Sequence, residues 1–165
     1  MTVMDTSTDD AVKKIRSGDM NLCVVGLGRM GLPIACLFAD AGAQVTGVDT
    51  NLQHVKLIAD GISPFSEPGL QALLKKVTTS GKLTVSTNLK EEVPRCEVVV
   101  IVVPTLVDPR KKPDYSILER VCRDVGLAVR KGSLIILEST VGPGFTETVA
   151  SGVVEKLSGL KAGVD

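Results

Sequence analysis

The chain has 165 residues, of which 44% are hydrophobic and 23% charged, and its 19 basic and 19 acidic side chains leave a formal net charge of zero. This composition is typical of one globular domain and excludes an intrinsically disordered chain. The balanced charge, the absence of a Lys/Arg block and the scarcity of aromatic side chains argue against nucleic-acid binding and against attachment to a membrane surface.

Residues 1–20 form a polar stretch before the first predicted strand. The sequence TSTD at residues 6–9 offers helix-capping side chains, and we expect a short helix that ends at Gly18. The stretch is acidic and polar rather than basic and apolar, so we expect neither a signal peptide nor a membrane anchor. No apolar run approaches the ~20 residues that a spanning helix needs. We therefore assign residues 1–20 to a helical extension and residues 21–165 to the domain proper.

A strand, a glycine turn and a helix are predicted from residue 21 onward. The largely apolar residues 21–25 run into GLGRMG at 26–31, followed by LPIACLFADAG. In this motif Gly26 permits the tight turn, Gly28 lets a pyrophosphate approach the backbone, and Gly31 lets the helix pack closely on the sheet. A helix N-terminus favours an anion, so the turn predicts a phosphate-binding site.

A second strand at residues 44–49 ends in an acidic residue about 20 positions after the turn. Asp49 has the position of the residue that binds the adenosine ribose hydroxyls in dinucleotide-binding folds. Neither Thr50 nor Asn51 offers the positive charge that a 2′-phosphate requires, which favours NAD over NADP. The alternative is a glycine turn and an acidic strand end without any ligand.

Strands and helices alternate along the rest of the chain. This order predicts an α/β fold, a Rossmann-type doubly wound parallel sheet between two layers of helices, in one domain. Further strands are expected at 82–86, 97–103 and 133–137, the last two buried, and helices at 52–60, 70–81, 115–130 and 145–157, with polar loops at 61–69 and 106–114 and a brief helical turn capped by Thr87 and Asn88.

The carboxyl ends of parallel strands meet at one edge of such a sheet, where ligands bind. Beside the turn and Asp49, this edge should hold two segments: Val103, Pro104 and Thr105, and Glu138, Ser139 and Thr140. Hydroxyl groups there can orient a nicotinamide or a substrate hydroxyl, and a carboxylate can accept a proton or hold a water. An equally weighted interpretation makes Thr105 and Thr140 caps of the following helices.

The single histidine and the cysteines suggest no self-sufficient active site. His54 is more typical of a solvated side chain than of a catalyst, and a lesser interpretation places it along the adenosine. The cysteines Cys23, Cys36, Cys96 and Cys122 are widely spaced, without CxxC or metal-ligand spacing, so we expect no metal site and free thiols in a reducing cytoplasm. Cys23 and Cys36 should be small buried hydrophobes, and Cys122 falls in an amphipathic helix.

From residue 21 onward the motifs resemble those of the nucleotide-sugar dehydrogenases that include UDP-glucose, GDP-mannose and UDP-N-acetylmannosamine dehydrogenases. The matching segments are VVGLGRMGLPIA, VTGVD, EPGL, VSTN, VPT with KPDYS, and LESTVGPGFTE. The forms LEST, VPT and KPD are most similar to the branch that acts on UDP-N-acetylmannosamine or a related UDP-N-acetylhexosamine. Several independent motifs in the same order carry this resemblance.

The resemblance implies oxidation of the sugar C6 alcohol to a carboxylate with two NAD, through an enzyme-bound thiol adduct, in a cytoplasmic and homo-oligomeric parent enzyme of polysaccharide biosynthesis. Glu138 would lie beside the nicotinamide and the substrate, with Thr105 in support. The residues expected to bind the cofactor are Gly26, Gly28, Arg29, Met30, Gly31, Asp49, Thr87, Val103, Pro104, Thr105 and Thr140.

The sequence departs from the pattern of the nucleotide-sugar dehydrogenases in three ways. Family members often carry an aromatic residue in place of Arg29 and an Arg in place of His54. The catalytic Cys of the family, with its Lys, Asn and Asp helpers, lies beyond the matching region, so we expect the NAD-binding domain of a larger enzyme, inactive alone. Two alternatives are a stand-alone NAD-binding or sensor module and the cofactor domain of a β-hydroxyacid dehydrogenase, which shares the GLGxMG start.

Overall fold

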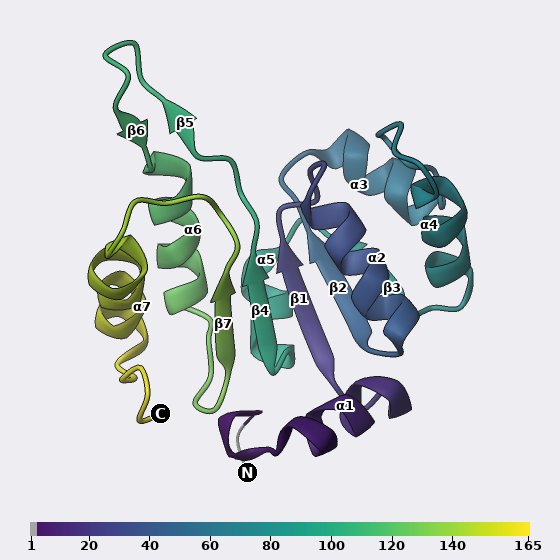
Figure 1. The fold of residues 1–165 in the computed structure, drawn as a ribbon, viewed down its shortest axis with the longest axis horizontal. Coiled ribbons are helices and arrows are strands. Elements are labelled where there is room, and N and C mark those ends of the chain that lie inside the picture. Colours follow the sequence, from purple (N-terminus) through teal and green to yellow (C-terminus); the bar gives the residue numbers. More distant parts are fainter. Residues whose placement is uncertain (1–2) are drawn as a thin grey trace.

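The computed structural model describes residues 3–165, which are built around a five-stranded parallel sheet (Figure 1). The strand order β3-β2-β1-β4-β7 places the first strand in the middle, and the chain reverses its direction of progress between β1 and β4. This is the predicted doubly wound arrangement, which is thereby confirmed. The strands are β1 (Asn21–Val25), β2 (Gln44–Val48), β3 (Leu83–Ser86), β4 (Val98–Ile101) and β7 (Leu134–Leu137).

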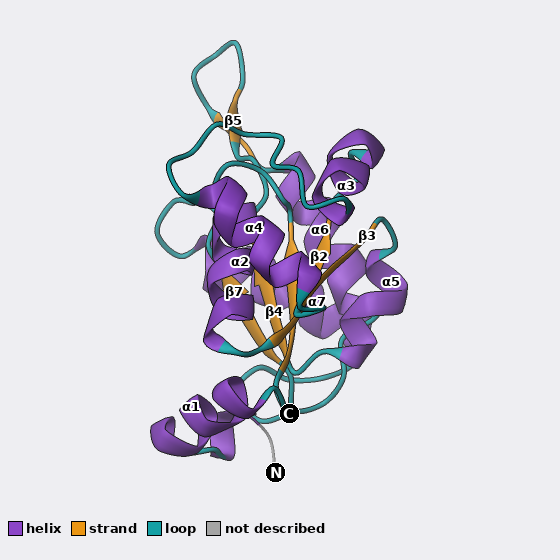
Figure 2. Cartoon of the chain, turned by 90° about the vertical axis from the view of Figure 1, so that its right-hand side faces the viewer, coloured by secondary structure: helices purple, strands orange, loops and turns teal. Residues whose placement is uncertain are grey.

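Helices cover both faces of the sheet because neighbouring residues of a strand point to opposite sides (Figure 2). Leu22 and Val24 of β1 join one buried cluster with α2, α3 and α4, whereas Cys23 and Val25 join a second cluster with α6 and the chain around α7. The central strands are therefore apolar on both faces. The helices are α2 (Gly31–Ala41), α3 (Leu52–Ala59), α4 (Leu70–Thr79), α5 (Leu89–Glu92), α6 (Ser116–Gly126) and α7 (Ser151–Ser158), with a 3₁₀ turn at Val93–Arg95 and a π-helical turn at Thr146–Ala150.

The predicted N-terminal helix is present as α1 (Thr8–Ser17), preceded by a 3₁₀ turn at Val3–Asp5. The Ser7 hydroxyl caps it by accepting a hydrogen bond from the Asp10 N–H at 3.2 Å, and Gly18 ends it with φ of 83°. Ala11 and Ile15 pack against the α2 side of the core. The helix lies below the amino ends of the strands, at the opposite edge from the glycine turn (Figure 1).

Residues 106–114, predicted as a polar loop, form a projecting hairpin of β5 (Leu106–Val107) and β6 (Pro113–Asp114) (Figure 1). The carboxylate of Asp108 accepts hydrogen bonds from the N–H groups of Arg110 and Lys112, both at 2.8 Å, which closes the bend. The loop predicted at 106–114 is thus confined to residues 108–112, and the residues on either side of it form two short strands.

Two further predictions were only partly right. The strand expected at 97–103 ends at Ile101, and the strand at the sheet edge, β7, is half-buried along its length rather than buried. One side of β7 has no neighbouring strand in the described chain, and an apolar hollow of about 460 Å³ lies between β7, α7 and the C-terminal residues. In residues 3–165, no helix combines the length and the apolar character that a membrane span requires.

Candidate functional site

A cleft of about 740 Å³ lies at the carboxyl ends of β1, β2 and β4, at the point where the strand order reverses. This is the place where ligands bind in doubly wound sheets. Nine of the residues predicted to bind a cofactor line it: Gly26, Gly28, Arg29, Met30, Gly31, Asp49, Thr87, Val103 and Pro104.

The glycine turn is shaped by two backbone approaches that no larger residue permits. Gly26 has φ of 98°, and a Cβ there would lie 2.2 Å from the carbonyl oxygen of Val102. A Cβ on Gly31 would lie 1.8 Å from the carbonyl oxygen of Gly26, so α2 starts directly against the turn. A Cβ on Gly28 would meet nothing within 4 Å, which leaves the space over the turn open to a ligand.

Backbone donors of the turn point to the same opening. Among residues 3–165, no acceptor lies in hydrogen-bonding geometry to the N–H groups of Gly28, Arg29 and Met30. The N–H of Leu27 is different, because it donates to the Asp49 carboxylate at 2.7 Å. Free N–H groups at the start of a helix, with the positive end of its dipole, form a cradle that suits a diphosphate.

Asp49 lies directly after β2 and joins the turn to the next helix. One of its oxygens accepts from Leu27 and the other accepts from the Asn51 N–H at 2.8 Å. The side chain is half-buried, and each carboxylate oxygen keeps a further lone pair for a ligand hydroxyl. The chemistry fits a ribose diol, and the open cradle beside it fits a dinucleotide phosphate.

Arg29 and His54 meet at Phe65, in the loop before α4. The Arg29 guanidinium contacts Glu67 at 2.8 Å and lies 5.6 Å from the centre of the Phe65 ring. His54 lines the cleft and packs edge-on against that ring with 5.4 Å between the ring centroids. His54 thus lies in the cleft wall, and its placement along the adenosine stays a prediction.

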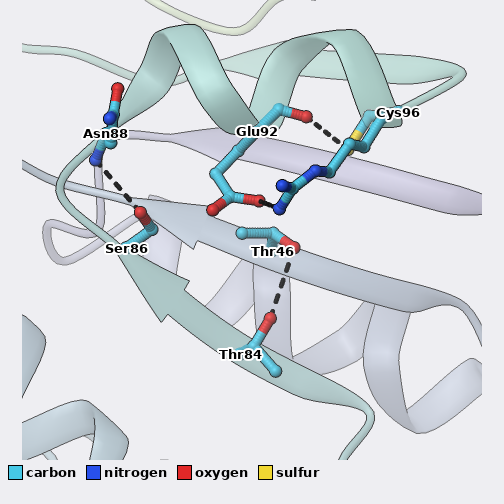
Figure 3. Close-up of polar contacts among 7 residues, drawn as sticks. Thr46, Thr84, Ser86, Asn88, Glu92 and Cys96 are labelled. Carbon is cyan, nitrogen blue, oxygen red and sulfur yellow. Dashed lines mark hydrogen bonds and ion pairs between the residues drawn. The ribbon is translucent and has the colours of Figure 1, made fainter.

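The segment after β3 is held by short polar contacts (Figure 3). The Ser86 hydroxyl accepts from the Asn88 N–H at 3.0 Å, which turns the exposed Thr87 toward the cleft. Asn88 precedes α5 as expected, but its side chain does not cap the helix. Below this turn, the hydroxyls of Thr46 and Thr84 lie 3.3 Å apart and join β2 to β3.

The segment at 138–140 lies beside the cleft rather than in its wall. The Ser139 hydroxyl donates to the Val103 carbonyl at 2.8 Å and accepts from the Val103 N–H at 3.0 Å, so it joins the ends of β7 and β4 instead of facing a ligand. Glu138 and Thr140 are exposed, and none of Thr105, Glu138 and Thr140 lines the cleft.

The helix-capping interpretation of the two threonines is wrong. The residue before α6 is Tyr115, and the residue before the π-helical turn is Phe145. Thr105 and Thr140 are therefore several residues too early in the chain to cap either helix.

Sequence reasoning missed the wall that α6 contributes. Ile117, Arg120, Val121 and Asp124 line the cleft from positions i, i+3, i+4 and i+7, which form one face of the helix. Lys90 of α5 forms an ion pair with Asp124 at 3.7 Å. The sequence predicted a helix at 115–130, but it was not assigned to the wall of the cleft.

All four cysteines are free, as predicted, and all four are buried, which confirms the burial predicted for Cys23 and Cys36. Burial raises the pKa of the Cys36 thiol to about 11 and that of the Cys122 thiol to about 11. A hydrogen bond between the Cys23 and Cys96 thiols raises the pKa of Cys23. No group of three or more His, Cys, Asp or Glu side chains in residues 3–165 is arranged to hold a metal ion.

Comparison with known proteins identifies the family. Residues 20–165 match the NAD binding domain of the UDP-glucose/GDP-mannose dehydrogenase family. The chain belongs to this family. It is therefore an NAD-binding domain of the nucleotide-sugar dehydrogenases, and the match over nearly the whole chain favours that family over the β-hydroxyacid dehydrogenases.

Individual members of the dehydrogenase family are similar over the same region. The UDP-N-acetyl-D-mannosamine dehydrogenase of Pyrococcus horikoshii is 40% identical over 146 residues, which are 88% of this chain and 34% of that protein. The GDP-mannose 6-dehydrogenase of Pseudomonas aeruginosa is 37% identical over 149 residues, with the same coverage. A crystal structure of a ternary complex of the Pseudomonas aeruginosa GDP-mannose dehydrogenase superposes with a TM-score of 0.85 at 36% identity, covering 88% of this chain and 34% of that one. The chain thus spans about a third of the length of these relatives.

Proposed function

We propose that the chain is the cofactor-binding part of an NAD-dependent nucleotide-sugar 6-dehydrogenase, which oxidises the C6 alcohol of a UDP-sugar to the uronate. The observation that carries the proposal is the cleft in which free N–H groups of the glycine turn and the Asp49 carboxylate face one opening. The relatives of this domain include dehydrogenases of UDP-N-acetyl-D-mannosamine and of GDP-mannose, which supports the reaction class.

Each part of the cleft has a task in this proposal. The N–H groups of Gly28 and Met30, with the Arg29 side chain, hold the diphosphate, and Asp49 accepts hydrogen bonds from the adenosine ribose. Val103 lies at the nicotinamide end. When bound, NAD supplies the hydride acceptor for the sugar alcohol.

The remaining predicted residues act at the rim of the cleft. Pro104 and Gly31 shape the walls, and Thr87 supplies a hydroxyl on the β3 side. Thr105 and Thr140 offer hydroxyls beside the nicotinamide end, and Glu138 offers an exposed carboxylate that can hold a water or accept a proton. These supporting roles agree with the position of the three residues just outside the cleft wall.

The substrate we propose is UDP-N-acetylmannosamine or a similar UDP-N-acetylhexosamine. Its support is the 40% identity with the Pyrococcus horikoshii enzyme, together with the LEST, VPT and KPD segments. We further infer a cytoplasmic role in polysaccharide biosynthesis, since four unpaired thiols suit a reducing compartment. The sugar site, the catalytic Cys and a homo-oligomer interface would be supplied by the part of the relatives that this chain does not span.

We propose that the N-terminal residues are not part of the cofactor-binding domain. The family match begins at residue 20, and α1 packs at the edge of the sheet opposite the cleft. Residues 1–20 are therefore an appendage to the cofactor-binding domain at 21–165.

Calorimetric titration of the purified chain with NAD, NADP and a UDP-sugar tests the proposal. We expect NAD to bind more tightly than NADP, because the Asp49 carboxylate repels a 2′-phosphate, and we expect no binding of the sugar nucleotide. A folded chain that binds no NAD refutes the cofactor site. Production of NADH from a UDP-sugar by these 165 residues refutes the assignment of the chemistry to the part of the relatives that this chain does not span.

A further inference from the structure

The loop at residues 61–69 is fixed to α4 before it reaches the cleft. The Gln71 side chain donates to the Gly61 carbonyl at 2.7 Å and accepts from the Ser63 N–H at 2.9 Å. The Ser63 hydroxyl donates to the Phe65 carbonyl at 2.8 Å, and the Phe65 ring packs against the core cluster under α2 and α4. The loop therefore presents its next residues from a fixed position.

Two side chains of this loop hold Arg29 of the glycine turn. Glu67 Oε1 lies 2.8 Å from Arg29 Nη1, across 38 residues of sequence, and the Phe65 ring lies 5.6 Å from the guanidinium carbon. The His54 ring packs edge-on against the same Phe65 ring. The guanidinium is thus held by a charged partner and by an aromatic face.

The held guanidinium lies at the same turn as the free backbone donors. The Arg29 side chain is 70% exposed, so the donors that Glu67 does not take remain open to a ligand. An arginine loses side-chain freedom when it binds a phosphate, and a partner that holds it beforehand removes part of that loss. Glu67 also carries a negative charge, but its exposure screens the repulsion of a nearby phosphate.

We propose that Glu67 and Phe65 are positioning residues that keep the Arg29 guanidinium ready to bind the cofactor diphosphate. This inference rests on the NAD site proposed above. It assigns a task to the EPGL segment, which contains Glu67, and it connects the loop before α4 with the glycine turn. Their effect on binding passes through Arg29.

Titration with ADP and with adenosine separates positioning of the arginine from general damage to the cleft. We expect Glu67→Ala to weaken ADP binding 3- to 10-fold while adenosine affinity stays within 2-fold, because only ADP carries the diphosphate. Glu67→Gln should bind ADP nearly as well as the parent chain, since its amide oxygen still accepts from Arg29. In an Arg29→Ala background, Glu67→Ala should cause no further loss.

Asp40→Ala is the matched control. Asp40 pairs with Lys76 in an exposed ion pair of nearly the same exposure, 34% and 68%, against 38% and 70% for Glu67 and Arg29, and it lies outside the cleft. It changes the net charge by the same amount and should leave ADP affinity unchanged. Thermal unfolding monitored by circular dichroism verifies that every variant is folded.

Three results overturn the inference. These are unchanged or tighter ADP binding in Glu67→Ala, equal weakening of ADP and adenosine, and a further loss in the Arg29→Ala background. If the parent chain binds neither ADP nor NAD, the proposed function fails, and this inference fails with it. If the parent chain binds both but Glu67→Ala matches it, only the positioning role is refuted.

Discussion

Replacing Asp49 by alanine perturbs the turn and the ligand site together, and the two effects can be measured apart. The carboxylate accepts hydrogen bonds from the N–H groups of Leu27 at 2.7 Å and Asn51 at 2.8 Å. A hydrogen bond to a charged group contributes about 1.5–3 kcal/mol, and partial exposure favours the lower end of that range. Losing both should reduce the free energy of unfolding by roughly 3 kcal/mol, which lowers the melting temperature of a chain of this size by about 6–12 °C.

The same substitution should weaken NAD binding, because the ribose hydroxyls lose a charged acceptor. A loss of about 1–3 kcal/mol of binding free energy raises the dissociation constant roughly 5- to 150-fold. Calorimetry at a temperature well below the melting point of the variant keeps the two effects separate.

Asp60→Ala is the control, since it removes one exposed carboxylate outside the cleft. Both its melting temperature and its NAD affinity should match the parent chain. If Asp49→Ala leaves the dissociation constant unchanged, Asp49 does not bind the ribose. If it leaves the melting temperature unchanged, the two N–H contacts do not stabilise the turn.

Three other substitutions test the packing and the burial described above. Gly31→Ala places a Cβ 1.8 Å from a backbone oxygen and should destabilise the chain by at least about 3 kcal/mol in urea unfolding. Gly152→Ala is the control: its Cβ would meet nothing within 4 Å, so this substitution should be neutral or stabilising. If Gly152→Ala is also destabilising, the loss in Gly31→Ala is not specific to the close contact at Gly31. Ser139→Ala removes both hydrogen bonds to Val103 and should cost about 1–2 kcal/mol; an unchanged unfolding midpoint would mean that these bonds do not hold the strand ends together. The Cys122 thiol, with its pKa raised to about 11, stays protonated when its unfolded counterpart ionises near the ordinary value of 9.0, so stability should fall from pH 9 to 11. The decline should be shallower in Cys122→Ala, and an equal slope would contradict the effect of burial on this thiol.

The sequence predicted those parts of the fold that depend on local pattern. The strand and the helix around the glycine turn were predicted correctly, because the apolar periodicity and the GxGxxG motif that indicate them each lie within about a dozen consecutive residues. β7 was expected to be buried because its apolar run resembles that of β4. Burial of its outer side depends on a neighbouring strand, which a local pattern does not report.

The cleft also contains residues that a local sequence pattern could predict and residues that it could not. Asp49 could be assigned from its distance to the turn, because the βαβ unit fixes that spacing. The contact of Arg29 with Glu67 joins residues 38 positions apart in different loops, and no sequence period specifies it. The hydroxyl of Ser139 looked available in the sequence, and only the approach of β7 to β4 shows that Val103 uses it.

The projecting hairpin of β5 and β6 is also a site where a protease can cleave the chain without dissociating the folded domain. Arg110, Lys111 and Lys112 are exposed at its bend, where a protease such as trypsin has access to the backbone. A single cut there separates the segment that carries β1 to β4 from the segment that carries α6 to α7. Because β4 and β7 remain paired and both segments share one core cluster, the two fragments should stay associated under native conditions and part only in denaturant.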